Sequence, residues 1–170
     1  MRKAIAVAAG LLLLVAVNWV IFERERLLEE GRVVVLELAP VDPRSLMQGD
    51  YMALRFKVAD EVFGRMRSSK APAQDGRIVV RTDPRGLASF VRHDGGEPLA
   101  AGEARLRYRV REEQVKFATN AFFFQEGTGG LYARARYGEF RVAPEGDLLL
   151  THLRGENLER IVAPRMQRSP

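Results

Sequence analysis

One stretch near the start of the chain constrains the fold more than any other part of the sequence. It leads from an apolar strand through a proline turn and a Gly-Asp pair into a second strand. Residues 32–39 are β-branched and then alternate, which is typical of a strand with a buried face. Gly49-Asp50 opens the second strand, expected at residues 51–58. Alternation along it predicts four core side chains on one face: Met52, Leu54, Phe56 and Val58.

The rest of the chain repeats this pattern of short alternating strands separated by glycine and proline turns. Further strands are expected at residues 77–82, 87–92, 103–110, 115–124, 139–143 and 147–153. Residues 59–66 favour either a short helix or an irregular crossover, and residues 131–137 favour a short helix that Gly138 ends. Many short strands with few helices predict a mainly β fold, an antiparallel barrel or sandwich with one or two short helices.

The N-terminal segment carries no charge over residues 4–22. As a helix it is about 28 Å long, close to the thickness of a bilayer's hydrocarbon core. A cleaved signal peptide usually has a shorter apolar run that ends in small residues, whereas this run ends in Asn18-Trp19-Val20-Ile21-Phe22. A buried helix would have a polar face, and this segment has none. We therefore predict an uncleaved transmembrane helix that continues into a helical stalk.

These features divide the chain into three parts. Residues 1–30 are the N-terminal tail, the transmembrane anchor and the helical stalk, residues 31–163 are the β-rich domain, and residues 164–170 are a flexible tail. The middle part is long enough to bury a core of its own. Basic residues are nearly balanced on the two sides of the anchor, so charge alone does not orient it in a membrane.

Charge and composition exclude several classes of function. The net charge of +5 comes from 27 basic and 22 acidic residues, which alternate along the chain. A nucleic-acid-binding protein would more often show a clustered basic stripe with aromatic residues in it, so no nucleic-acid partner is expected. The absence of cysteine excludes disulfides and thiolate metal sites. His93 and His152 are far apart and lack ligand-like neighbours, so no metal site is expected.

Two stretches differ from ordinary strands and turns and contain the candidate functional residues. The first is residues 42–51, where Gly49 suits a positive-φ turn position and Asp50 suits hydrogen bonding to neighbouring backbone N–H groups. Turn chemistry of this kind is one interpretation. The other interpretation places Asp50 and Arg44 at the mouth of a loop, as an ion pair or a ligand clamp.

The second stretch begins with three phenylalanines and Gln125-Glu126-Gly127 at residues 122–127. It continues with Tyr132, Arg136, Tyr137, Gly138 and Glu139. Two rings are expected to face the core, and the middle one, Phe123, to meet a sheet edge, a membrane or a partner. A carboxyl group beside these rings favours partial desolvation, which would suit Glu126 to acid–base catalysis; helix capping or pairing with an arginine is the alternative. The catalytic candidates are Asp50 and Glu126. The candidate ligand- or partner-binding residues are Arg44, Gly49, Asp50, Tyr51, Phe123, Gln125, Glu126 and Gly127.

Both stretches resemble the GDYXXLXY-domain family of bacterial membrane-anchored proteins. The motif in the family's name is matched by Gly49-Asp50-Tyr51, Leu54 and Phe56. A later part of the family's sequence is matched by residues 122–139. The resemblance implies an N-terminal transmembrane helix, an extracytoplasmic β-rich domain and an association with polytopic membrane proteins. It implies no established activity. Phe56 stands where the name motif has tyrosine, so the ring is kept without its hydroxyl, which indicates packing rather than reaction.

These observations predict a membrane-anchored extracytoplasmic accessory protein that acts with a polytopic membrane protein in a bacterial inner membrane. Its expected partners are the lipid bilayer and that membrane protein, and no cofactor is expected. The alternative hypothesis is an extracytoplasmic hydrolase or small-ligand-binding domain that uses Arg44, Asp50 and Glu126. Convergence of these three side chains in one concave site would favour the alternative.

Overall fold

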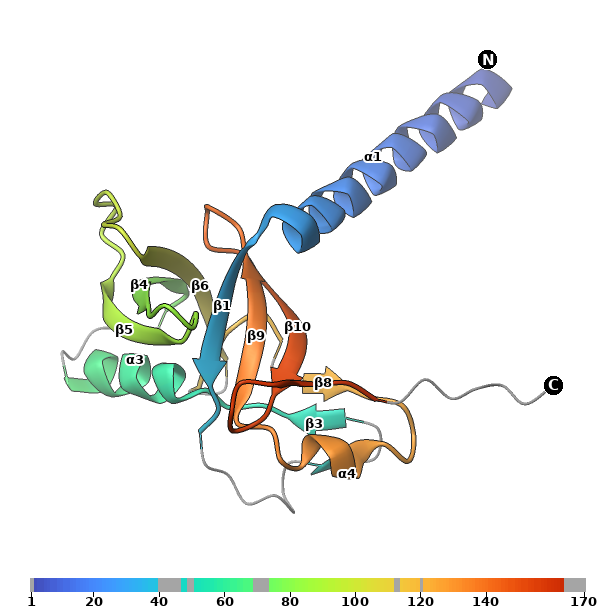
Figure 1. Ribbon diagram of the computed structural model, residues 1–170. Coiled ribbons are helices and arrows are strands. Elements are labelled where there is room, and N and C mark those ends of the chain that lie inside the picture. The colour runs from blue at the N-terminus through green and yellow to red at the C-terminus, as the bar shows by residue number, and fades with distance from the viewer. Residues whose placement is uncertain are drawn as a thin grey trace. The chain divides into compact units, whose positions relative to one another are not determined.

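The computed structural model describes residues 2–39, 47–48, 51–68, 74–111, 114–119 and 121–163. Contacts divide the chain into two compact units, Met1–Gly31 and Arg32–Pro170. The first unit contains one helix, α1 (Arg2–Glu30), and the second contains the strands and the other helices (Figure 1).

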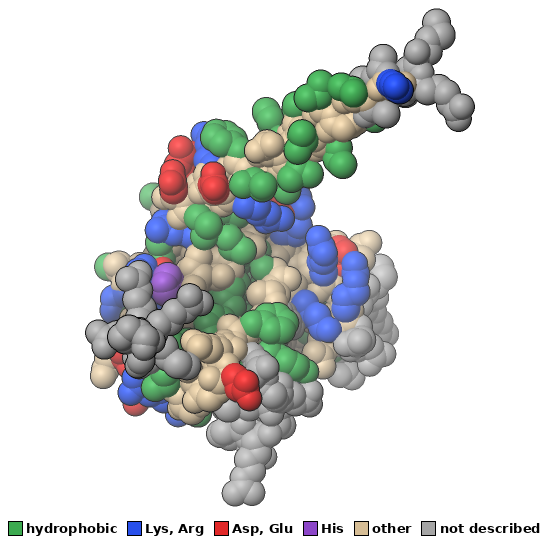
Figure 2. All heavy atoms as spheres, turned by 90° about the vertical axis from the view of Figure 1, so that its right-hand side faces the viewer, with side chains coloured by type: hydrophobic (Ala, Val, Ile, Leu, Met, Phe, Trp, Pro, Cys, Tyr) green, Lys and Arg blue, Asp and Glu red, His purple; other side chains and the backbone are tan. Residues whose placement is uncertain are grey.

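Helix α1 is rich in alanine and leucine, which favour the helical conformation. Apolar side chains are exposed at successive positions along it, so no single apolar stripe forms (Figure 2). Trp19, for example, is 65% exposed. The amide of Asn18 stays within the helix, where its Nδ2 donates to the backbone oxygen of Leu14 at 2.8 Å. The helix therefore presents apolar surface around its circumference.

The structure corrects the prediction of a transmembrane segment. Within the part of the chain that the structure describes, no helix has the apolar length needed to span a membrane.

The Arg32–Pro170 unit is built from antiparallel sheets. The first sheet has the order β1-β9-β10-β11, with β1 at Arg32–Glu37, β9 at Tyr137–Val142, β10 at Leu148–Arg154 and β11 at Arg160–Ile161. β1, β9 and β10 lie side by side in Figure 1. Val34, Val35 and Leu36 are fully buried, so the centre of β1 is covered on both faces.

The second sheet has the order β5-β4-β6-β7, with β4 at Gly76–Thr82, β5 at Ala88–His93, β6 at Glu103–Arg111 and β7 at Gln114–Lys116. The turn between β4 and β5 follows from its Asp-Pro-Arg-Gly sequence. Asp83 Oδ1 accepts the backbone N–H groups of Arg85 and Leu87 at 2.8 and 2.9 Å. Gly86 has φ +83°, a left-handed conformation that glycine adopts without a steric penalty.

The described residues of this unit also form a third, short sheet and two helices. The sheet has the order β2-β3-β8, with β2 at Met47–Gln48, β3 at Tyr51–Ala53 and β8 at Ala121–Phe123. Helix α3 (Lys57–Ser68) buries Val58, Val62 and Met66 at the four-residue spacing of one helix face. Helix α4 covers Gly129–Tyr132. The predicted mainly β, antiparallel fold with few helices is confirmed.

The strand expected at residues 51–58 ends earlier than predicted. It stops at Ala53, because α3 begins at Lys57 and Phe56 makes only an isolated bridge with Leu38. The predicted core face is nevertheless correct. Its four side chains are at most 6% exposed: Met52, Leu54, Phe56 and Val58.

Three other predictions of local structure are wrong. The strand expected at residues 115–124 is divided between two sheets as β7 and β8, and Ala118 between them has φ +48°, which interrupts an extended strand. The helix expected at residues 131–137 is the shorter α4, and Gly138 lies inside β9 instead of ending a helix. β11 was not predicted.

Candidate functional site

The sheet β2-β3-β8 brings together the two stretches that the sequence singled out, and we call it the motif sheet. β3 is its central strand. On one side Tyr51 pairs with Gln48 of β2, and on the other side Tyr51 pairs with Phe123 and Met52 with Phe122 of β8. The first stretch and the phenylalanine stretch are therefore neighbours, although they are far apart in the sequence.

The three consecutive phenylalanines have different environments. Phe122 and Phe124 both pack on the buried Tyr132 of α4. The ring centroid of Tyr132 lies 4.9 Å from that of Phe122 and 5.5 Å from that of Phe124. Phe123, between them, is 75% exposed. Its ring contacts Tyr51 across the strand pair, at 5.8 Å between centroids. The motif sheet thus presents one large aromatic side chain to the surroundings, supported by a second ring.

The remaining candidates do not form a described site. The turn that leads from β8 to α4 is exposed at Gln125, Glu126 and Gly127. The carboxyl group of Glu126 therefore does not have the expected desolvated environment. The turn is stabilised locally, since Gln125 O accepts the Thr128 backbone N–H at 3.0 Å. The other predicted residues of the pocket lie outside the described residues: Arg44, Gly49 and Asp50.

Beyond the motif sheet, the residues that follow the first stretch also meet the second stretch in the core. The ring of Phe56 lies over Gly138 of β9: a Cβ atom at Gly138 would come within 3.0 Å of Phe56 Cε1 and 3.2 Å of the Phe140 ring. Phe56 and Phe140 make an edge-to-face contact at 5.3 Å between centroids. Glycine is therefore needed at residue 138 because an aromatic ring occupies the space of its side chain. This contact supports packing, rather than chemistry, as the role of Phe56.

The next residue of β9, Glu139, lies in a cluster of charges that the sequence did not reveal. Its carboxylate is 1% exposed and accepts hydrogen bonds from Arg154 of β10 at 2.6 Å and from Arg160 of β11 at 2.7 Å. The Nδ1 atom of His152, on β10, is 3.8 Å from Glu139 Oε1. We call these four residues the Glu139 cluster. Their only local signal is that His152 and Arg154 stand two positions apart on one strand face.

Electrostatics in the Glu139 cluster are dominated by burial and by the two arginines. Burial alone raises the pKa of Glu139, but hydrogen bonds from Arg160 and Arg154 outweigh it and hold the pKa below its ordinary value. Burial lowers the pKa of His152, and the nearby arginines act in the same direction, whereas Glu139 opposes them. Glu139 is therefore ionised and His152 is neutral at neutral pH.

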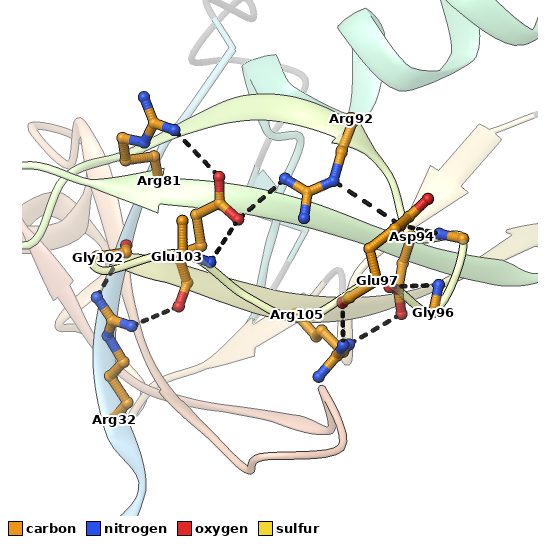
Figure 3. Close-up of polar contacts among 11 residues, drawn as sticks. Arg32, Arg81, Arg92, Asp94, Gly96, Glu97, Gly102, Glu103 and Arg105 are labelled. Atoms are coloured by element: carbon orange, nitrogen blue, oxygen red, sulfur yellow. Dashed lines mark hydrogen bonds and ion pairs between the residues drawn. The ribbon is translucent and has the colours of Figure 1, made fainter.

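A second buried carboxylate, Glu103, is held in the same way in the second sheet (Figure 3). It accepts from Arg81 at 3.1 Å and from Arg92 at 2.9 Å, while its side chain is only 3% exposed. The backbone N–H of Ala100 and the Arg92 guanidinium hold the pKa of Glu103 below its ordinary value. Arg32 of β1 donates to the backbone oxygen of Glu103 at 2.6 Å, which ties the first sheet to the second.

Asp94 repeats this arrangement at the end of β5 (Figure 3). Its side chain is 1% exposed and pairs with Arg77 and Arg105, each at 3.1 Å. It also accepts the backbone N–H of Gly96 at 3.1 Å. Each of the three buried carboxylates described here is thus bonded to two arginines, which suits a structural role and leaves no free general acid or base among them.

The described residues also form a pocket of about 140 Å³ between α3 and β7. Its lining residues are Arg55, Phe56, Ala59, Asp60, Phe63, Gln114 and Val115. The two charged groups at its rim pair with each other, since Arg55 Nη2 lies 2.9 Å from Asp60 Oδ1. No group of three or more metal-ligating side chains is found among the residues that the structure describes.

Together these features define a class of protein: a small β-rich domain in which two characteristic stretches pack on each other and expose one phenylalanine. The model of the GDYXXLXY protein family matches residues 13–153. The chain belongs to this family. No curated protein and no solved structure matches the chain.

Proposed function

We propose that the protein is an accessory interaction protein that docks on a polytopic membrane protein at the extracytoplasmic face of a bacterial inner membrane. The observation that carries this proposal is the exposure of Phe123, at 75%, on the motif sheet. A large aromatic side chain held outward by a rigid sheet is the kind of anchor that dominates the energy of protein–protein interfaces. The neighbouring ring of Tyr51 extends this contact surface.

Helix α1 supports the same proposal independently. Its apolar side chains are exposed at successive positions from Leu11 to Phe22. A contiguous apolar surface of this kind marks a site of contact with another protein or with lipid. Association of α1 with an apolar surface of the partner protein would cover it.

The buried carboxylates also favour an accessory role over an enzymatic one. A general acid or base needs a titratable group that is free to exchange a proton with substrate. The buried carboxylates are not free in this sense, because each is bonded to two arginines: Glu103, Asp94 and Glu139. The alternative hypothesis, a hydrolase or ligand-binding domain that uses Arg44, Asp50 and Glu126, stays a prediction.

Crosslinking of the full-length protein in its native membrane, followed by mass spectrometry, tests the docking proposal. We expect one abundant polytopic partner, and we expect Phe123→Ser to reduce its recovery about tenfold, the effect of losing an interface anchor. Val162→Ser is the matched control, because Val162 is a comparably exposed apolar side chain, at 70%, that does not belong to the motif sheet. Full recovery with Phe123→Ser, or equal losses with both variants, would contradict the proposal.

A further inference from the structure

We propose that His152, Glu139 and Arg160 form an acid-sensitive latch that releases β11 from the edge of the first sheet when His152 takes up a proton. The inference does not depend on the proposed function. It starts from an unusual polar atom: Nδ1 of His152 is buried and has no hydrogen-bond partner. At 3.8 Å from Glu139 Oε1, it is too far away for a hydrogen bond.

Arg160 shares with His152 the nearest carboxylate oxygen. Its Nη2 donates to Glu139 Oε1 at 2.7 Å, and its Nε donates to Oε2 at 3.0 Å. A neutral histidine leaves this arrangement undisturbed. An imidazolium would place a second positive charge beside the Arg160 guanidinium, with its Nδ1–H competing for the oxygen that Arg160 binds.

β11 depends strongly on Arg160. The strand is held to β10 by two residue pairs, Leu153 with Ile161 and Arg154 with Arg160. The turn that precedes it contains Leu158 at φ +63°, a conformation that disfavours a branched side chain. With only two residue pairs and one ion-paired side chain to hold it, β11 is the most weakly attached strand of its sheet. Its release would expose the buried Ile161 and the edge of β10.

The charges around His152 determine which contact breaks. They are Glu139 and Arg141 of β9, Arg154 of β10 and Arg160 of β11, whereas β1 places the uncharged Val35 opposite Glu139. Protonation adds one more cation to a site with a single carboxylate. Arg160 is the arginine that can leave, since its side chain is 47% exposed against 18% for Arg154. Its departure frees Glu139 Oε1 to accept from the imidazolium.

The direction of the pH effect follows from the environment of His152. Burial lowers its pKa in the latched state below the ordinary value of about 6.5. The released state, with His152 better solvated, binds more protons than the latched state. Acidification through and below that value therefore favours release, and the latch stays closed at higher pH.

Hydrogen exchange of the full-length protein tests the latch at the backbone amides of Arg160 and Ile161. After correction for intrinsic exchange rates, we expect their protection to fall about tenfold between pH 7.5 and pH 5.5, because the released state binds the additional proton. His152→Gln should abolish this change. His93→Gln, which removes the only other histidine, should leave it intact.

Two further measurements keep the test decisive if His152→Gln folds poorly. Arg160→Gln should show low protection of Ile161 at both pH values, because the latch is then always open. In the unmodified protein, the titration midpoint of the His152 ring, measured by NMR, should coincide with the midpoint of the loss of protection. Equal protection at both pH values in the unmodified protein, an undiminished loss in His152→Gln, or separate midpoints would overturn the proposal.

Discussion

The two faces of β9 carry opposite kinds of interaction. On one face, Gly138 and Phe140 pack against the ring of Phe56 in an apolar core. On the other face, Glu139 binds two arginines and lies beside His152. Residues next to each other in one strand therefore stabilise the fold by different physical effects. Packing contributes at every pH, whereas the contribution of the charges changes with the protonation of Glu139 and His152.

The comparison also separates the family's characteristic residues by role. Phe56 stands at the last position of the motif in the family's name and Gly138 lies in the second stretch, and their contact explains both of them as parts of one packing arrangement. Phe123 lies in the second stretch as well but is exposed, so packing does not explain it. The difference directs the search for function to the motif sheet and away from the core.

The largest effect should come from removing the ring on the apolar face. Phe56→Ala is expected to lower the free energy of unfolding by about 3–5 kcal/mol, because the side chain is 1% exposed and its loss leaves a cavity. Urea unfolding followed by circular dichroism measures the change. Phe123→Ala is the matched control: the same substitution at a 75% exposed position should stay within about 0.5 kcal/mol. Equal effects at the two positions would contradict the assignment of core and surface.

Adding a methyl group on the same face should have a smaller effect. Gly138→Ala places a Cβ 3.0 Å from Phe56 Cε1, and overpacking of this kind is expected to cost about 1–3 kcal/mol. Because the clash depends on the ring, the double variant with Phe56→Ala should be more stable than the sum of the two single changes predicts. Additive losses in urea unfolding would show that the ring does not limit residue 138.

Gly64→Ala provides a control of opposite sign for Gly138→Ala. Gly64 lies inside α3, and a Cβ there would meet nothing within 4 Å. Alanine favours the helical conformation over glycine, so this change should stabilise the protein by up to about 1 kcal/mol. A loss of stability at Gly64 would show that the effect at residue 138 is not specific to the close contact.

The sequence predicts local features of these regions better than it predicts their assembly. Alternation correctly identified Met52, Leu54 and Phe56 as core, because a period of two depends only on neighbouring residues. The end of the strand at Ala53 was missed, since it is decided by where α3 packs. The motif sheet was likewise not predictable in detail, because pairing β3 with β8 joins segments that have no local relation.

The Glu139 cluster shows most clearly what a single sequence leaves out. Its members come from three strands, and the register of β9, β10 and β11 brings them into contact. The sequence contains many arginines and glutamates, so nothing local distinguishes Arg160 from an ordinary surface residue. Burial of the carboxylate, rather than residue type, makes the cluster significant, and burial follows only from the assembled sheet.

The smallest effect should come from the charged face and should depend on pH. Glu139→Gln removes the carboxylate that the two arginines share, and we expect a loss of about 1–2 kcal/mol at pH 7, limited because Arg160 is half exposed and screened by solvent. The folded-state pKa of Glu139 is lowered, so its charge stabilises the protein above the ordinary value of about 4.3. That stabilisation disappears as the pH falls through the lowered value.

Urea unfolding at pH 7, 5 and 3 distinguishes this effect from simple loss of packing. The difference between Glu139→Gln and the unmodified protein should be largest at pH 7 and should shrink toward pH 3, because the unfolded state takes up a proton at this carboxyl group before the folded state does. Glu145→Gln, at an exposed carboxylate in the turn before β10, should stay within about 0.5 kcal/mol at pH 7. A pH-independent difference at residue 139 would mean that both faces of β9 act through packing alone, which would remove the distinction between them.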